Sequence, residues 1–160
     1  MTLTLITGAN KGLGFETARR LIAAGHTVYL GARDRDRGTA AAGAIGARFV
    51  PLDVTDDACV DAALSRLADE AGGLDVLINN AGITGNGVAP VDVTAEDMRR
   101  VYETNVFGIV RVTHAALPLL NKSARPVIVN VASGLGSLGV VTNPRRMESH
   151  RSLVSDRPAL

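Results

Sequence analysis

Short apolar runs alternate with longer amphipathic stretches along most of the chain. The runs lie at residues 3–6, 27–30, 48–52, 74–79 and 127–131. Each run is mostly apolar instead of alternating between apolar and polar, which is typical of parallel strands that are covered on both faces. The pattern therefore predicts five buried strands.

Helical spacing of apolar residues fills the segments between these runs. The expected helices span residues 13–24, 36–44, 56–70 and 96–120. Asp56 and Gly72 mark the two ends of the third helix, Thr94 with Asp97 is a capping signal before the fourth, and Pro118 falls in its last turn. Strands that alternate with helices at this spacing predict an α/β fold, a doubly wound parallel sheet whose ligands bind beyond the carboxyl ends of the strands.

The composition narrows the class of protein and of partner. A length of 160 residues fits one domain, and 46% hydrophobic with 21% charged residues is typical of a globular protein. Only 3% of the residues are aromatic and the net charge is +1, which argues against a nucleic-acid partner. The apolar runs are too short to cross a membrane and no signal-peptide pattern opens the chain, so we expect a cytoplasmic protein without membrane contact.

The thiol and imidazole side chains do not suggest a metal site. Cys59 is the single cysteine, so an internal disulfide is excluded, and it is expected to pack in a helix as a small apolar residue. His26, His114 and His150 lack the spacing of metal ligands. No metal is expected.

Glycines cluster directly after the first expected strand, in Thr7-Gly8-Ala9-Asn10-Lys11-Gly12-Leu13-Gly14. Glycine lets the backbone turn sharply and approach a pyrophosphate, and the free amides at a helix start attract the anion. A tight strand-to-helix turn without a ligand is the alternative for such a cluster. Its position between a strand and a helix favours a phosphate-binding loop.

Further short motifs follow the later strands. They are Leu52-Asp53-Val54, Asn79-Asn80-Ala81-Gly82, Thr104-Asn105-Val106-Phe107-Gly108 and Val129-Asn130-Val131-Ala132-Ser133. With the Gly-x-x-x-Gly-x-Gly spacing of the first loop, this order over about residues 1–139 resembles the short-chain dehydrogenase/reductase superfamily. The loop residues and the Gly31-Ala32-Arg33-Asp34 segment are similar to its carbonyl-reductase-like branch.

The resemblance implies a Rossmann-type sheet with strand order 3-2-1-4-5 and hydride transfer between a nicotinamide and a carbonyl or secondary alcohol. It also implies residue roles. Cofactor contacts fall on Gly8, Asn10, Lys11, Gly12, Leu13 and Gly14 at the pyrophosphate, Asp53 and Val54 at the adenine, and Asn80, Ala81 and Gly82 along the ribose and nicotinamide. Ser133 would hydrogen-bond the substrate, and Asn105 would order a proton-relay water.

The end of the second expected strand bears on the choice of cofactor. An acidic residue there pairs with a ribose 2′-hydroxyl, whereas a cation suits a 2′-phosphate. The acidic position falls on Ala32, Arg33 follows it, and Lys11 lies in the glycine loop. NADP(H) is therefore favoured over NAD(H). Asp34 is the competing ribose ligand, and a solvated Arg-Asp stretch is the alternative without a cofactor.

The resemblance also implies a catalytic Tyr-x-x-x-Lys pair, which this sequence lacks. The only tyrosines are Tyr29 and Tyr102, and no lysine follows Lys122. Residues 140–160 are expected to form an irregular basic tail after a binding domain at 1–139. We interpret this as a frameshift, an early stop or a shortened chain, with the later strands, helices and subunit contacts missing.

Two consequences are expected for the chain as it stands. The helix at 96–120 would expose an apolar face and the strand at 127–131 would be a bare edge, which predicts low stability and association. Catalysis would be very weak because the tyrosine is absent. The chain would then be an impaired NADP-dependent reductase for a small carbonyl or alcohol, a dinucleotide-binding module without catalysis, or an inert fragment.

Overall fold

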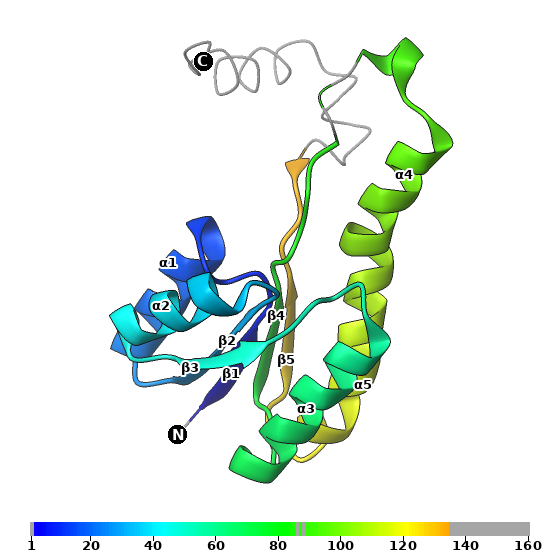
Figure 1. The fold of residues 1–160 in the computed structure, drawn as a ribbon. Coiled ribbons are helices and arrows are strands. Elements are labelled where there is room, and N and C mark those ends of the chain that lie inside the picture. The colour runs from blue at the N-terminus through cyan, green and yellow to red at the C-terminus, as the bar shows by residue number, and fades with distance from the viewer. Residues whose placement is uncertain (1, 86, 88, 135–160) are drawn as a thin grey trace. The chain divides into compact units, whose positions relative to one another are not determined.

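The computed structural model describes residues 2–85, 87 and 89–134, and it divides the chain into two units, residues 1–130 and 131–160. The first unit holds one sheet of five strands: β1 (Leu3–Ile6), β2 (Thr27–Ala32), β3 (Arg48–Pro51), β4 (Val76–Asn79) and β5 (Val127–Asn130). Neighbouring strands pair in parallel in the order β3-β2-β1-β4-β5, as Figure 1 shows. The predicted fold class and strand order are confirmed.

The helices lie in the sequence positions that the apolar spacing predicts. They are α1 (Gly12–Ala23), α2 (Arg35–Ile45), α3 (Asp57–Ala71), α4 (Ala95–Tyr102) and α5 (Gly108–Leu120), with a 3-10 turn at Pro90–Asp92. The helix expected over 96–120 contains a π-helical turn at Glu103–Phe107, between α4 and α5. Such turns carry one extra residue within a helix and recur at functional sites. Pro118 lies in the last turn of α5, as predicted.

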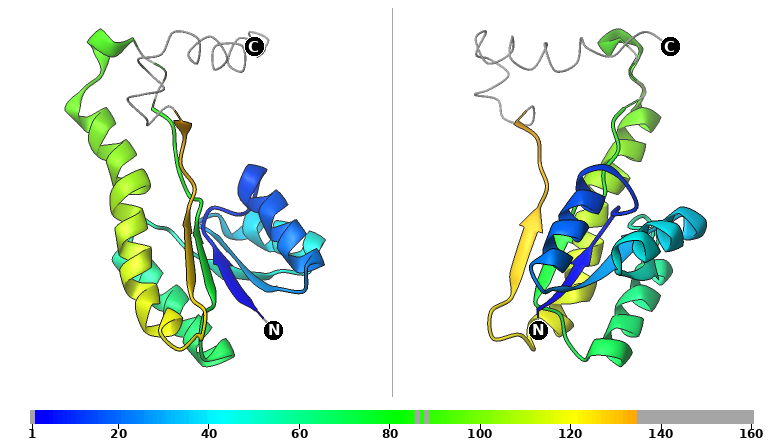
Figure 2. Two further views of the ribbon diagram at one scale, coloured as in Figure 1. Left: turned by 180° about the vertical axis from the view of Figure 1, so that it is seen from behind. Right: turned by 90° about the vertical axis from the view of Figure 1, so that its left-hand side faces the viewer.

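The two faces of the sheet carry different helices, as the two views in Figure 2 show. On one face, α1 and α2 pack over Ile6, Val28 and Leu30 in one apolar cluster. On the other face, α3 and α5 pack over Leu5 and Tyr29 in a second cluster. Both faces of the central strands are therefore buried, which explains why their sequences are continuously apolar.

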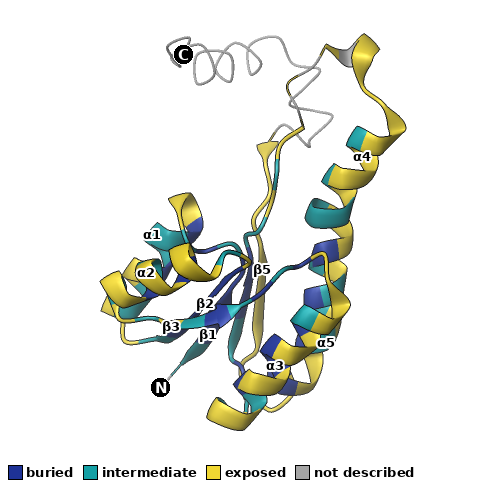
Figure 3. Cartoon of the chain, viewed as in Figure 1, coloured by how far each residue is buried: buried dark blue, intermediate teal, exposed yellow. Residues whose placement is uncertain are grey.

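Burial is uneven across the sheet (Figure 3). Every residue of β2 after Thr27 is buried, whereas all four residues of β5 are exposed, Val127 by 47% and Ile128 by 42%. Large apolar side chains are also exposed along α4, the π-turn and α5. They are Met98, Tyr102, Val106, Phe107, Val110 and Leu117. Exposure of this helix and of the last strand agrees with the expectation, while association and low stability stay predictions.

At the amino ends of the strands, polar groups are hydrogen-bonded by side chains of the protein itself. One Asp75 carboxylate oxygen accepts a hydrogen bond from the Leu3 amide at 2.8 Å, and the other accepts one from the Ser123 hydroxyl at 2.5 Å. These bonds hold the pKa of Asp75 below its ordinary value, Ser123 contributing most. Beside them, the buried Thr4 hydroxyl and His26 Nδ1 are hydrogen-bonded at 2.9 Å.

In the described part of the chain, no helix combines the length and the apolar character needed to cross a membrane.

Candidate functional site

A cavity of about 380 Å³ lies in the first unit, where the loops that follow β1, β2, β3 and β4 meet. It is lined by Gly8, Asn10, Lys11, Gly12, Leu13, Gly14, Ala32, Arg33, Leu52, Asp53, Val54, Thr55, Asn80, Ala81, Gly82, Ile83 and Thr104. All the residues that the sequence suggested as cofactor contacts are in this lining. Parallel strands end at one edge of the sheet, which brings together four loops that are distant in sequence.

Sequence reasoning missed part of the lining. Thr55 and Ile83 also line the cavity, and each directly follows a motif that was singled out, so extending those motifs by one residue would have found them. Ala32, Leu52 and Thr104 were named within motifs or at the end of the second strand, but were not assigned as cofactor contacts.

The glycine loop brings backbone close to the cavity. Gly8 has φ +62°, and a Cβ there would lie 2.8 Å from the Cα of Ala81. A Cβ on Gly14 would lie 2.4 Å from Nδ2 of Asn80. Only glycine fits at either position, because any side chain would push the β1 loop away from the β4 loop.

The helix that follows this loop has an uncapped amino terminus. Lys11 stands at the N-cap of α1 and makes no side-chain cap hydrogen bond, and the first turn contains no acidic residue. By contrast, Asp34, Asp56 and Thr94 cap α2, α3 and α4. The partial positive charge at the start of α1 is thus directed into the cavity lining without a carboxylate to neutralise it, which suits an anion.

Thr7 and Asn80 fasten the β1 loop to the β4 loop. The hydroxyl of the buried Thr7 accepts hydrogen bonds from the Asn80 amide at 3.0 Å and from the Ala81 amide at 2.9 Å. In return, Asn80 Nδ2 donates to the carbonyl oxygens of Thr7 and Gly8 at 2.9 and 3.1 Å. Asn80 therefore holds the phosphate-loop backbone in place with its side chain. Thr7 was not assigned a role from the sequence.

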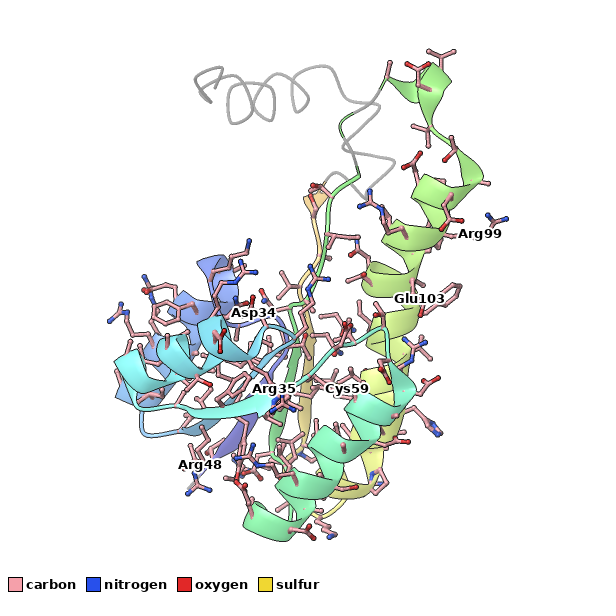
Figure 4. All side chains as sticks on the ribbon, viewed as in Figure 1. Asp34, Arg35, Arg48, Cys59, Arg99 and Glu103 are labelled. Atoms are coloured by element: carbon pink, nitrogen blue, oxygen red, sulfur yellow. The ribbon has the colours of Figure 1, made fainter. Side chains whose placement is uncertain are left out.

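At the end of β2, the two charged residues differ in their surroundings. Arg33 is exposed and lines the cavity. Asp34, labelled in Figure 4, is the N-cap of α2. Its carboxylate accepts hydrogen bonds from the Arg37 amide at 2.9 Å and from Arg37 Nε at 2.7 Å. These two bonds from Arg37 lower the pKa of Asp34. Asp34 does not line the cavity, so the competing acidic residue is engaged elsewhere.

The wall that follows β3 is shaped by short-range hydrogen bonds. Asp53 Oδ1 accepts from the amide and the hydroxyl of Thr55, at 3.0 and 2.7 Å. The Asp53 amide donates to the sulfur of Cys59 on the first turn of α3, at 3.2 Å. Cys59 is only partly buried and is an acceptor for this loop, so the expectation of a simple packed apolar residue is incomplete.

The two residues suggested for catalysis lie in different units. Asn105 is in the π-turn, where Oδ1 accepts from the Ile83 amide at 2.9 Å and Nδ2 donates to the Ile83 carbonyl at 2.8 Å. Its side chain therefore fixes the segment that leaves β4. Ser133 is exposed and belongs to the second unit, and residues 135–160 lie outside the described residues. Among described residues, no group of three or more His, Cys, Asp or Glu could hold a metal ion.

Comparison with known proteins places this geometry in a family context. A family model described as short chain dehydrogenase matches residues 2–145. A short-chain dehydrogenase of Penicillium roqueforti is 39% identical over 151 residues, an alignment that covers 89% of this chain and 60% of that protein. The chain therefore spans about 60% of the length of this curated relative.

The backbone of this chain is also similar to those of solved structures. A short-chain dehydrogenase from Streptomyces avermitilis superposes with a TM-score of 0.78 at 35% identity, over 86% of this chain and 51% of that one. The menthone neomenthol reductase of Mentha piperita also reaches a TM-score of 0.78, at 30% identity over 94% of this chain and 72% of that one. Both the sequence and the backbone are thus similar to those of oxidoreductases.

Proposed function

This chain belongs to the short-chain dehydrogenase family, and from this premise we propose that its cavity binds NADP(H) for an oxidoreductase of that type. The observation that carries the proposal is the lining itself, which joins a glycine loop, an uncapped helix start and Arg33 at one edge of the sheet. Family members bind nicotinamide dinucleotides. The substrate class we propose is a small carbonyl compound or the matching secondary alcohol.

The phosphate groups would bind at the start of α1. Amides of Gly12, Leu13 and Gly14 lie at the positive end of this helix, and the Lys11 side chain adds a full charge beside them. Gly8 and Gly14 permit a close approach because neither carries a Cβ. The adenine would lie against Asp53 and Val54, since this wall is the part of the lining that follows β3.

The preference for NADP(H) over NAD(H) rests on the end of β2. A guanidinium at Arg33 and the ammonium of Lys11 both line the cavity, and Ala32 occupies the position of the family's acidic residue. Asp34 would have to give up two hydrogen bonds from Arg37 to reach a ribose. At the end of β2, a 2′-phosphate would therefore meet cations, whereas the carboxylate nearest in sequence, Asp34, is already bonded to Arg37.

When bound, the nicotinamide supplies or accepts a hydride at the substrate carbon. The residues of this chain would position the two molecules: Asn105 fixes the segment at Ile83, and Ser133 would donate a hydrogen bond to the substrate oxygen. The oxygen also needs a proton donor, which a tyrosine with lowered pKa provides in the family. The 160 residues contain no Tyr-x-x-x-Lys sequence, so we expect turnover near background.

Calorimetric titration tests the cofactor proposal directly. We expect NADPH to bind roughly tenfold or more tightly than NADH, and Arg33→Ala to remove most of that difference because the 2′-phosphate loses its guanidinium. Arg35→Ala is the matched control, since Arg35 is also exposed and lies outside the cavity lining. Equal affinities for NADPH and NADH in the unmodified chain would contradict the proposal.

A dinucleotide-binding module without catalysis is the second candidate. Tyr29 cannot serve as the proton donor, because it is fully buried and its hydroxyl is bonded to Glu70 at 3.2 Å and to Arg48 at 2.9 Å. NADPH oxidation with a panel of aldehydes and ketones separates the candidates. Steady turnover would refute the module, and binding without turnover would refute the active enzyme.

A cytoplasmic location stays a prediction, which cell fractionation would test.

A further inference from the structure

Arg111 on α5 joins three separate segments of the first unit. Its side chain is only 19% exposed. Nη1 donates to the Val54 carbonyl at 2.6 Å, Nη2 donates to Glu103 Oε1 at 2.8 Å, and Nε donates to the Asp57 carboxylate. One guanidinium thus binds the loop after β3, the π-turn and the first turn of α3. Hydrogen bonds from a charged donor to carboxylates are stronger than neutral ones, and a planar fork fixes their directions.

The contacts of Arg111 lie at the edge of the nucleotide cavity. Val54 lines the cavity and is only 7% exposed, and Glu103 directly precedes Thr104, which also lines it. Gly108, one helical turn before Arg111, packs on the same loop, because a Cβ there would lie 2.8 Å from Cγ2 of Val54. The first turn of α5, which directly follows the π-turn, therefore meets the loop after β3 through two adjacent contacts with Val54.

We propose that Arg111 is a positioning residue for the nucleotide site. Its guanidinium holds two walls of the cavity, the loop after β3 at Val54 (the Val54 wall) and the π-turn at Glu103, at a fixed separation. This inference rests on the proposed function, since it gives Arg111 a purpose in nucleotide binding. Without the guanidinium, the Val54 carbonyl loses its donor and Glu103 loses its cation, so both walls of the cavity are free to move. The part of the nucleotide that contacts the Val54 wall is then held less well.

Arg66 provides a matched control for a purely structural role. On α3, its Nε donates to Glu70 at 2.6 Å and its Nη1 donates to the Phe49 carbonyl at 3.1 Å. It thus also links a carboxylate to a carbonyl oxygen in the β3 region. Arg66 is not in the cavity lining, and neither are its hydrogen-bond partners Glu70 and Phe49. Substitution of either arginine removes hydrogen bonds to a carboxylate and to a backbone carbonyl, but only Arg111 bonds a residue of the cavity lining, Val54.

The test compares Arg111→Met, Arg111→Lys and Arg66→Met in the full chain, with NADPH and its fragment 2′,5′-ADP as ligands in calorimetry. We expect Arg111→Met to weaken both ligands roughly tenfold and Arg111→Lys to restore part of the loss, since lysine keeps the charge but not the fork. Arg66→Met is expected to lower the unfolding midpoint while leaving both affinities within about twofold. Equal affinity losses in Arg111→Met and Arg66→Met would overturn the inference.

Hydrogen–deuterium exchange separates this inference from the proposed function. In the ligand-free chain, the amides of residues 53–55 and 104 are expected to exchange faster in Arg111→Met than in Arg66→Met, because only the former releases both walls. If the unmodified chain binds no NADPH, the proposed function fails, and Arg111 is judged on exchange alone. Unchanged exchange at these amides in Arg111→Met would overturn the positioning role in either case.

Discussion

The two ends of the strands differ in one respect: side chains of the protein bond the amino ends, whereas the loops at the carboxyl ends surround a cavity. At the amino ends, Asp75 binds the Leu3 amide and the Ser123 hydroxyl, and Thr4 binds His26, so the protein satisfies these groups itself. At the carboxyl ends, a cavity lined by glycine-rich loops remains. One end of the sheet is thus closed by the protein's own hydrogen bonds, and the other holds the cavity for which we propose a ligand.

The amino termini of the helices differ in whether a side chain caps them. Asp34, Asp56 and Thr94 each accept a hydrogen bond from the first turn of the helix that they precede. Only for α1, among the helices that begin after a loop in the described residues, does the N-cap side chain make no such bond. An uncapped terminus costs stability unless another acceptor is supplied. Among the described helices that begin after a loop, the one uncapped start is therefore the one whose residues line the cavity.

The largest loss of nucleotide affinity is expected from adding a methyl group to the glycine loop that follows β1. Gly14→Ala places a Cβ 2.4 Å from Asn80 Nδ2, so Asn80 must release the Thr7 and Gly8 carbonyls or α1 must shift. We expect NADPH affinity to fall roughly 100-fold, on the order of 2.7 kcal/mol. Calorimetry below the unfolding transition measures it.

Gly43→Ala is the control for this substitution. Gly43 is also helical, and a Cβ there meets nothing within 4 Å. Its expected effect is a gain of about 1 kcal/mol in helix stability with unchanged NADPH affinity. If both alanine variants bind NADPH as tightly as the unmodified chain, the close approach of the two loops has no role in binding.

An intermediate effect is expected at the amino ends of the strands. Asp75→Ala leaves the Leu3 amide without its acceptor, which should lower the free energy of unfolding by about 2 kcal/mol and leave NADPH affinity unchanged. The folded-state pKa of Asp75 is lowered, so its contribution is present above the unfolded pKa of about 4 and is lost as the pH falls further.

Urea unfolding at pH 7 and pH 3 measures both parts of this prediction. The gap between the unmodified chain and Asp75→Ala should narrow at the lower pH, because protonation weakens the same bonds that the substitution removes. Asp69→Ala, on the exposed side of α3, is the control and should change little. A gap that widens at pH 3 would refute the assignment of the stabilising charge to Asp75.

The smallest effect is expected at the cap of α2. Asp34→Ala removes the acceptor of the Arg37 amide and should slightly lower the midpoint of urea unfolding. Nucleotide affinity should stay unchanged for both NADH and NADPH, because Asp34 does not line the cavity. A selective loss of NADH binding would instead identify Asp34 as the ribose ligand and reverse the proposed cofactor preference.

Much of the fold and of the cavity lining could be read from local patterns. The apolar run at residues 27–30 predicts a strand, which the structure extends to Ala32, and a glycine cluster directly after a strand predicts a loop at the sheet edge. The π-turn was not predicted, because an extra residue in a helix barely changes the apolar spacing on either side. The apolar pattern alone predicted burial for both β2 and β5, which is wrong for β5. Its exposed edge was expected only from the family resemblance, which implies that later strands are missing.

Local patterns were enough to predict most strand and helix positions and the α/β class, and the family resemblance added the strand order and most residues around the cavity. These predictions follow from periodicity and from motifs of a few consecutive residues. The hydrogen bonds that hold the cavity in shape could be found only from the folded chain. Asn80 and Thr7 are 73 positions apart, and Arg111 and Val54 are 57 apart, so no local pattern links them. Such bonds depend on how the loops meet once the sheet has formed.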